Sequence, residues 1–210
     1  MPSPTALPLS RERIVRCAVL LADRDGLDAA SLRKVAAALG VHVTSLYHHV
    51  PTKEALLDGL VEELFAGADL PVGELPWEQW VREYTGAIAR LAAQHPGAFA
   101  VLLRRPVQGP LAAATFEAGL AAFHRAGMAV PESYAAVKSV ALGVLGCCIE
   151  RAFHAAGAEL STDVHGLSQR DFPVLHQVIS VTGEVDVVAS LADLLVAGLA
   201  HRLDHPVRPQ

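Results

Sequence analysis

Cysteines, aromatic residues and long hydrophobic runs are all scarce in this chain of 210 residues. Its three cysteines, Cys17, Cys147 and Cys148, match neither a disulfide framework nor the spacing of zinc ligands, so we expect reduced thiols packed as small apolar side chains. No apolar run reaches the roughly 18 residues that a membrane span requires. The N-terminus lacks the hydrophobic segment of a secretion signal. The sequence therefore predicts a cytoplasmic protein with no membrane partner.

The composition excludes a disordered chain, and the charge is unevenly spread. Apolar residues make up 52% of the sequence, which is too many for intrinsic disorder. The net charge is −5, yet residues 1–56 contain seven Lys/Arg and five Asp/Glu. The first quarter is therefore basic and the remainder carries the acidic excess. A local basic region permits contact with nucleic acid phosphates even though the whole chain is acidic.

Helical periodicity runs through the whole sequence, and no alternating strand pattern accompanies it. Ile14, Cys17, Ala18 and Leu21 recur at the spacing of an amphipathic helix. The same spacing predicts further helices over residues 32–39, 43–49, 77–93, 98–103, 111–126, 131–155, 172–179 and 184–203, and a helix after Thr52 that carries Leu56, Leu57, Leu60 and Leu64. The predicted fold class is all-α, with about nine to ten helices. We expect a disordered arm over 1–9, a DNA-binding domain over 10–68 and a second domain over 77–205.

Polar and glycine residues mark where the first helices begin and end. Ser10, Ser31 and Thr52 each precede a helical pattern and are good N-caps. Gly26 ends the first helix, and Gly40 supplies the positive φ that a sharp turn requires. Residues 31–50, SLRKVAAALGVHVTSLYHHV, therefore read as a helix, a tight turn and a second helix. This is the arrangement that places a recognition helix in the major groove of DNA.

The exposed positions of this second helix carry groups suited to reading DNA. Val43 and Thr44 offer methyl groups to thymine, and Thr44, Ser45 and His48 offer hydrogen-bond donors and acceptors. Tyr47 can bond a phosphate while its ring packs. Three further residues are expected to contact the DNA backbone from the starts of neighbouring helices: Ser31, Arg33 and Lys53. A helical hairpin with a merely solvated polar face is the alternative. His49 is expected to face back into the domain, and the role of His42 is left open.

The stretch GLDAASLRKVAAALGVHVTSLYHHVPTKEALLDGL resembles the DNA-binding domain of the tetracycline-repressor (TetR) family. The segments LAAQHPGAF, RRP at 104–106 and LGVLGCCIERAFH resemble its C-terminal domain more loosely and lie in the family's order. The resemblance implies DNA-contacting roles for Val43, Thr44, Ser45, Tyr47, His48 and Lys53. It also implies a C-terminal bundle that binds a small-molecule effector and forms a homodimer.

The C-terminal part supplies candidates for both of these tasks. Small residues line two long helices that could form a dimer surface: Ala136, Ser139, Gly143 and Gly146 on the first, and Ala189, Ala192, Ala197 and Gly198 on the second. Intramolecular packing of these helices is the alternative. Candidate residues for an apolar pocket within the bundle are Tyr84, Ile88, Phe116, Phe123, His124, Glu150, Arg151 and His154. The resemblance implies positions at or near the ligand for Tyr84, Ile88, Arg104, Phe116, Glu150 and His154. For any single aromatic among them, plain core packing is the competing interpretation.

The sequence predicts no cofactor and no dedicated metal site, but it leaves a metal open at one place. Glu150 and His154 stand at i and i+4 on one helix, a spacing that allows metal binding or an ion pair. In the tetracycline repressors a histidine before the RP dipeptide ligates the drug-bound magnesium, and Val101 takes that place here. We therefore expect a different, hydrophobic effector.

Three classes of function remain in competition at this stage. The leading hypothesis is a repressor that binds a palindromic operator as a dimer and is released by its effector. A ligand-independent DNA-binding regulator is the second. A metal-dependent hydrolase is the third, although no nucleophile elbow, HExxH motif or phosphate loop supports it.

Overall fold

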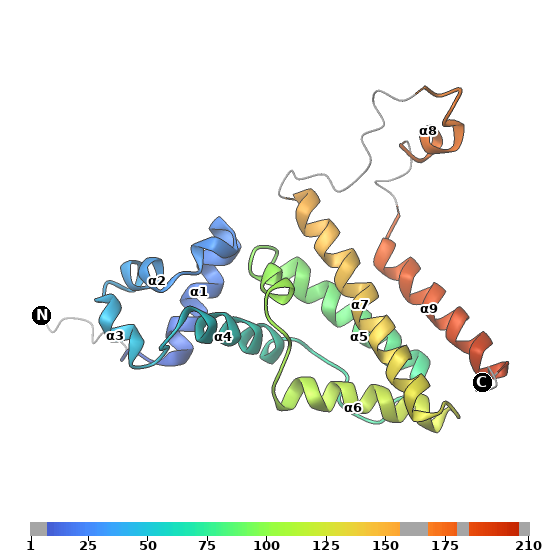
Figure 1. The fold of residues 1–210 in the computed structure, drawn as a ribbon, viewed down its shortest axis with the longest axis horizontal. Coiled ribbons are helices and arrows are strands. Elements are labelled where there is room, and N and C mark those ends of the chain that lie inside the picture. The colour runs from blue at the N-terminus through green and yellow to red at the C-terminus, as the bar shows by residue number, and fades with distance from the viewer. Residues whose placement is uncertain (1–7, 156–167, 180–184, 206–210) are drawn as a thin grey trace, which may run out of the picture. The chain divides into compact units, whose positions relative to one another are not determined.

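The computed structural model describes residues 8–155, 168–179 and 185–205, and within these ranges it is entirely helical (Figure 1). Nine α-helices and two 3-10 helices follow in the described residues: α1 Arg11–Asp25, η1 Leu27–Ala29, α2 Leu32–Leu39, α3 Val43–Tyr47, α4 Lys53–Ala66, α5 Trp77–Gln94, η2 Ala98–Leu103, α6 Pro110–Arg125, α7 Val130–Ala155, α8 Pro173–Ile179 and α9 Val187–Asp204. The predicted all-α class is confirmed.

The predicted helix ends of the first part are present in the structure. The side chains of Ser10, Ser31 and Thr52 accept hydrogen bonds from the backbone N–H groups three residues later, as N-caps do. Gly40 has φ 68°, in the left-handed region, and its N–H bonds back into the end of α2. One boundary differs from the prediction: α3 ends at Tyr47, so His48 and His49 lie beyond it.

The chain folds into two compact units. The first comprises residues up to 69 together with 91–114, and the second comprises residues 70–90 and 115 onward. The division after residue 69 falls between the expected domains, 10–68 and 77–205. Residues 91–114, which the sequence analysis placed in the second domain, instead pack with α1, η1 and α4 through η2.

The two units have separate apolar cores. In the first unit, Ile14, Leu46, Leu56 and Leu60 are completely buried. The core of the second unit joins α5, α6, α7 and α9 through Trp77, Trp80, Val81, Ala122, Phe123, Met128, Ala136, Val137, Val140 and Leu199. The α7 and α9 helices run antiparallel and pack on each other (Figure 1).

By length and hydropathy alone, Val130–Ala152 of α7 could cross a membrane. Core helices of globular proteins pass the same test, and this helix has core positions of its own. Val137, Val140 and Val144 are fully buried in the second unit. The apolar character of α7 therefore has an explanation in packing.

The three cysteines are free thiols in the structure. Cys148 is buried, whereas Cys17 and Cys147 are half-buried. Burial raises the pKa of Cys148 to about 11, so it stays a neutral thiol that packs like a small apolar group.

Candidate DNA-binding surface and ligand site

Two buried side chains hold α3 on the first unit and thereby decide which residues it exposes. Leu46 in α3 and Val50 after it are at most 1% exposed. The turn at Gly40 brings α3 against α2, and the two helices pack on each other. Thr44 and Tyr47 of this short helix are left exposed, and exposed side chains are what a recognition helix requires.

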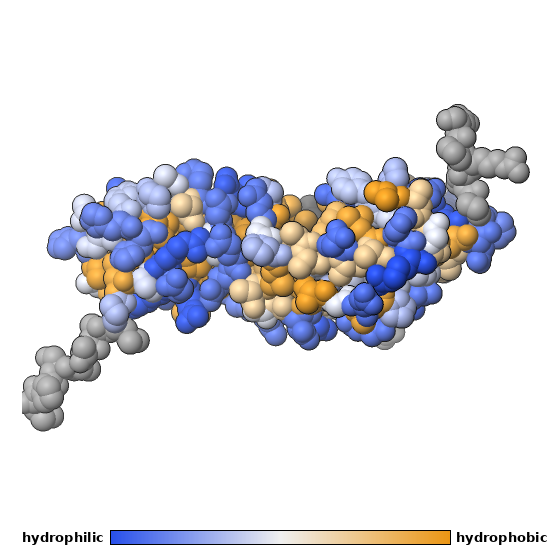
Figure 2. Space-filling view, turned by 90° about the horizontal axis from the view of Figure 1, so that it is seen from below, coloured by the Kyte–Doolittle hydropathy of each residue, from blue (hydrophilic) through white to orange (hydrophobic). Residues whose placement is uncertain are grey.

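Most of the predicted DNA-contacting side chains are exposed. Arg33, Thr44, His48 and Lys53 are exposed, and Tyr47 is 49% exposed. On the face drawn in Figure 2, hydrophilic residues cover most of the first unit, and its hydrophobic residues form small, separated patches. The surface around α3 is therefore polar and accessible.

Three of the predicted residues are only half-buried: Ser31, Val43 and Ser45. The hydroxyl oxygen of Ser31 already accepts a hydrogen bond from the Lys34 N–H at 3.3 Å. Because only the oxygen takes part in the cap, the hydroxyl proton of Ser31 can still be donated to a DNA phosphate. Contact of these eight residues with DNA stays a prediction.

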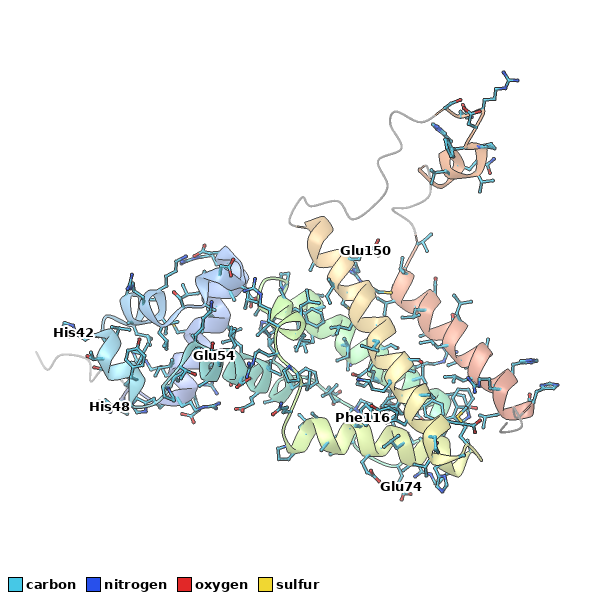
Figure 3. The ribbon with its side chains drawn as sticks, viewed as in Figure 1. His42, His48, Glu54, Glu74, Phe116 and Glu150 are labelled. Carbon is cyan, nitrogen blue, oxygen red and sulfur yellow. The ribbon has the colours of Figure 1, made fainter. Side chains whose placement is uncertain are left out.

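Histidines border α3 on both sides. His42 occupies the N-cap position but makes no side-chain cap hydrogen bond, and it is exposed. His49 is also exposed, which contradicts the expectation that it faces back into the domain. Figure 3 shows His42 and His48 on the outside of the first unit. The helix ends at Tyr47, so His49 lies in the turn after it, where its side chain is exposed.

A set of charged contacts joins η2 to the helices of the first unit. Asp23 at the end of α1 contacts two groups: Nδ1 of His95 at 2.7 Å and the backbone N–H of Ala98, which donates to it at 2.9 Å. Arg104 donates to Asp28 at 2.9 Å, and Arg105 donates twice to Asp58, at 2.6 and 2.8 Å. We call these contacts the η2 clasp. The sequence analysis missed it.

The contacts of the η2 clasp favour the ionised carboxylate and guanidinium groups that form them. The hydrogen bond from Arg104 holds the pKa of Asp28 below its usual value. The hydrogen bond to Asp58 raises the pKa of Arg105. These contacts also show where Arg104, a predicted ligand-binding residue, lies: its guanidinium bonds Asp28 within the first unit.

The other predicted ligand-binding residues lie in the second unit, and several are core residues. Ile88 is 3% exposed and Phe123 is fully buried. Tyr84 stacks on Trp80 with ring centroids 5.0 Å apart, and burial raises its pKa to about 12. Phe116 is half-buried and meets Tyr134 edge-on at 6.0 Å. These packing contacts give the aromatics a structural role, and their contact with a ligand stays a prediction.

The structure does not gather these candidates into one place. Figure 3 shows Glu150 toward the C-terminal end of α7, well separated from Phe116 on α6. The side chain of His154, the proposed partner of Glu150, lies outside the described part of the structure. Among the described residues, no group of three His, Cys, Asp or Glu side chains is arranged to hold a metal.

A groove of about 290 Å³ lies elsewhere in the second unit, between α5, α7 and the start of α9. Its lining residues are Arg82, Thr85, Gly86, Ala89, Arg151, Asp186, Val188, Ala189, Ala192 and Asp193. Of the ligand-binding candidates considered from sequence, it contains Arg151. The volume is at the lower end of the range of small-molecule sites. Arg82 and Asp193 form an ion pair across it at 2.5 Å.

The chain is similar to known proteins in both sequence and fold. The family model described as "Bacterial regulatory proteins, tetR family" matches residues 14–60. The HTH-type transcriptional repressor DrrR1 of Streptomyces coeruleorubidus is 31% identical over 91% of this chain and 71% of its own length. The class D tetracycline repressor of Escherichia coli is 30% identical over 70% of this chain and 69% of its own length.

Two further comparisons extend this result. An HTH-type transcriptional regulator of Saccharopolyspora erythraea is 38% identical over 66% of this chain, and the match spans 59% of that relative. The crystal structure of apo ActR from Streptomyces coelicolor superposes with a TM-score of 0.77 over 95% of this chain and 99% of ActR, at 22% identity. At that identity the superposition shows the shared fold.

This chain carries a helix-turn-helix on a helical scaffold, and its relatives are named transcriptional regulators. It is therefore a DNA-binding regulator of transcription and not an enzyme. The chain belongs to the TetR family.

Proposed function

We propose that this chain is a cytoplasmic repressor that binds a palindromic operator as a homodimer and is released from DNA by a small hydrophobic inducer. The observation that carries the proposal is the exposed, acid-free surface of α3, held in place by Leu46 and Val50. Named repressors among the relatives support the direction of regulation. BioQ, a structural neighbour with a TM-score of 0.65, is solved with its double-stranded DNA operator.

Release by an inducer is supported by the groove in the second unit and by the neighbours. ActR is solved in complex with actinorhodin and with (S)-DNPA. An inducer acts by binding better to a form of the dimer whose two recognition helices no longer fit successive major grooves. If operator affinity ignores every small molecule shown to bind the protein, the ligand-independent regulator replaces this proposal.

An operator selected from random DNA provides the first test of the recognition surface. We expect Tyr47→Ala to weaken operator binding about tenfold, because an exposed tyrosine can bond a phosphate. Lys53→Ala should weaken binding to all sequences and lower the salt slope by about one, since it removes one phosphate contact. Fluorescence anisotropy at several salt concentrations measures both effects.

Matched controls for these two variants lie in the other unit. Tyr134 is 53% exposed, and Lys138 is the chain's lysine outside the first unit. Tyr134→Ala and Lys138→Ala should leave the salt slope unchanged. Equal binding by all four variants would place DNA on a different surface.

For the proposed dimer we assign the outer faces of α7 and α9, and the exposure of residues on these helices supports that assignment. Of the small residues expected there, Ala136 and Ala192 are buried, and Gly143 faces the side chain of Leu191 within the same chain. Exposed positions recur at helical spacing on both helices: Ala135, Ser139, Leu142 and Gly146 on α7, and Val187, Ser190, Leu194, Ala197, Gly198 and His201 on α9. Leu142 is 59% exposed and Leu194 is 72% exposed.

We expect Leu194→Glu to weaken the dimer by about a hundredfold or more. In a two-fold interface the leucine is buried twice, and each burial contributes roughly 1.5–3 kcal/mol. Size-exclusion chromatography with light scattering measures the effect. Val72→Glu changes another exposed apolar residue, 50% exposed and outside both helices, and should leave the dimer intact. A dimer unaffected by Leu194→Glu would refute this interface.

A further inference from the structure

A 25-residue stretch around the recognition helix contains no acidic residue. Residues 29–53 carry Arg33, Lys34 and Lys53, and also three of the chain's ten histidines, in a protein whose net charge is −5. The histidines are His42, His48 and His49, and all three are exposed. If each imidazole takes up a proton, the positive charge of this stretch doubles.

The three imidazoles are not engaged elsewhere. Among the described residues, none of them has a hydrogen-bond or ion-pair partner. The element packed against α3 is α2, whose charged residues are both basic. The other charged groups of the surrounding segments are Arg24 and Asp25 at the end of α1, Asp28 in η1, and Lys53 and Glu54 at the start of α4.

Two of the three carboxylates in these segments are already engaged with arginines. Asp25 bonds Arg24 at 2.7 Å, and Asp28 bonds Arg104 at 2.9 Å. Glu54, in the first turn of α4, is exposed and follows directly after Lys53 (Figure 3). The surroundings of the histidines are therefore electropositive in the free protein, and DNA phosphates would reverse that field.

We propose that binding of duplex DNA by this chain takes up protons at His42, His48 and His49, so that its affinity for DNA rises as the pH falls from 8 to 6. The inference rests on the proposed DNA-binding function. Imidazole is the side chain that changes charge in this pH range. When protonated, it offers two N–H donors and a positive charge to phosphate oxygens.

The sign and size of the effect follow from proton linkage. A phosphate beside an imidazole favours the charged form, so the bound state holds its proton to higher pH than the free state. Protonation therefore contributes most to DNA affinity at low pH, and this contribution is lost as the pH rises. A histidine whose pKa rises by one unit on binding changes the affinity about fivefold between pH 8 and pH 6. Three such histidines would change it about a hundredfold.

The test uses the full chain and a 30-bp mixed-sequence duplex at constant ionic strength. Fluorescence anisotropy at pH 6, 7 and 8 should show the wild-type dissociation constant falling by ten- to a hundredfold toward pH 6. The salt slope at pH 6 should exceed that at pH 8 by about 0.9 for each added phosphate contact. In the triple variant H42Q/H48Q/H49Q both changes should disappear, whatever affinity the variant retains at pH 8.

Controls separate the inference from the proposed function. His205→Gln removes an exposed histidine at the end of α9 and should keep the wild-type pH response. Each single variant should remove part of the response, which keeps the test valid if the triple variant does not fold. A triple variant with the full pH response, or wild-type binding that ignores pH, would overturn the inference. Failure to bind any duplex at any pH would overturn the proposed function itself.

Discussion

Replacing Gly97 by alanine should destabilise the first unit by about 3 kcal/mol, near the upper end of the usual cost of overpacking. A Cβ added at Gly97 would lie 2.0 Å from the carbonyl oxygen of Ala22 and 2.9 Å from Cα of Asp23. A carbon and a carbonyl oxygen normally stay more than about 3.3 Å apart. Because the obstacle is the backbone of α1 and not a flexible side chain, the whole η2 segment must move outward.

That movement would break contacts on both sides of the glycine. Asp23 holds Nδ1 of His95 and the N–H of Ala98, and Gly97 lies between these two residues. Hydrogen bonds to a charged group each contribute about 1.5–3 kcal/mol. Gly97 has φ −83°, which alanine adopts without strain, so the expected loss comes from the close approach alone.

Urea denaturation followed by circular dichroism measures the loss of stability in Gly97→Ala. Hydrogen exchange offers a local reading, because the Ala98 N–H loses its carboxylate acceptor and should exchange faster. Gly73→Ala is the matched control: its new Cβ meets nothing within 4 Å, so it should be neutral or stabilising by a few tenths of a kcal/mol. Equal stability of both variants would show that η2 does not dock on α1 as described.

Replacing Phe123 by alanine should lower the free energy of unfolding by about 3–5 kcal/mol. Phe123 is completely buried, and its ring lies 5.5 Å from that of Trp77 and 6.2 Å from that of Trp80. Truncation leaves a cavity beside both indoles. The wall on that side cannot close easily, because Gly119 already approaches Trp80 closely enough that an added Cβ would lie 2.5 Å from the ring.

Tryptophan fluorescence measures this prediction directly, since Trp77 and Trp80 are the chain's two tryptophans. Urea denaturation should show a lower midpoint in Phe123→Ala, with altered emission of the folded state. Phe172→Ala is the control, because Phe172 is 45% exposed and its truncation should cost little. A small loss in Phe123→Ala, together with loss of an inducer response, would favour the ligand-contacting role predicted from sequence over the packing role.

Local signals in the sequence predicted the caps and the turn of the helix-turn-helix well. The caps at Ser10, Ser31 and Thr52 and the turn at Gly40 depend on residues three or four positions apart, so they can be identified without tertiary structure. The inward positions Leu46 and Val50 follow from helical spacing in the same way. The end of α3 was less predictable, because a five-residue helix carries little periodicity.

The η2 clasp and the groove could not be predicted in the same way. Asp23 and His95 are 72 positions apart, and Arg105 and Asp58 are 47 apart. Nothing in the local sequence of RRP at 104–106 indicates which carboxylates its arginines meet. The groove likewise depends on how three distant helices approach one another, and α5 turns Arg82, Thr85, Gly86 and Ala89 toward it while Tyr84 stacks on Trp80.

The sequence by itself determined the helical class, the helix-turn-helix and the polar character of its exposed face, because each depends on short-range periodicity and capping. Tertiary structure alone decided that residues 91–114 join the DNA-binding unit, that Arg104 bonds Asp28, and that some of the small residues on α7 and α9 are used within the chain. The physical reason is that ion pairs and close backbone approaches form between segments far apart in sequence, where only the folded chain selects the partner.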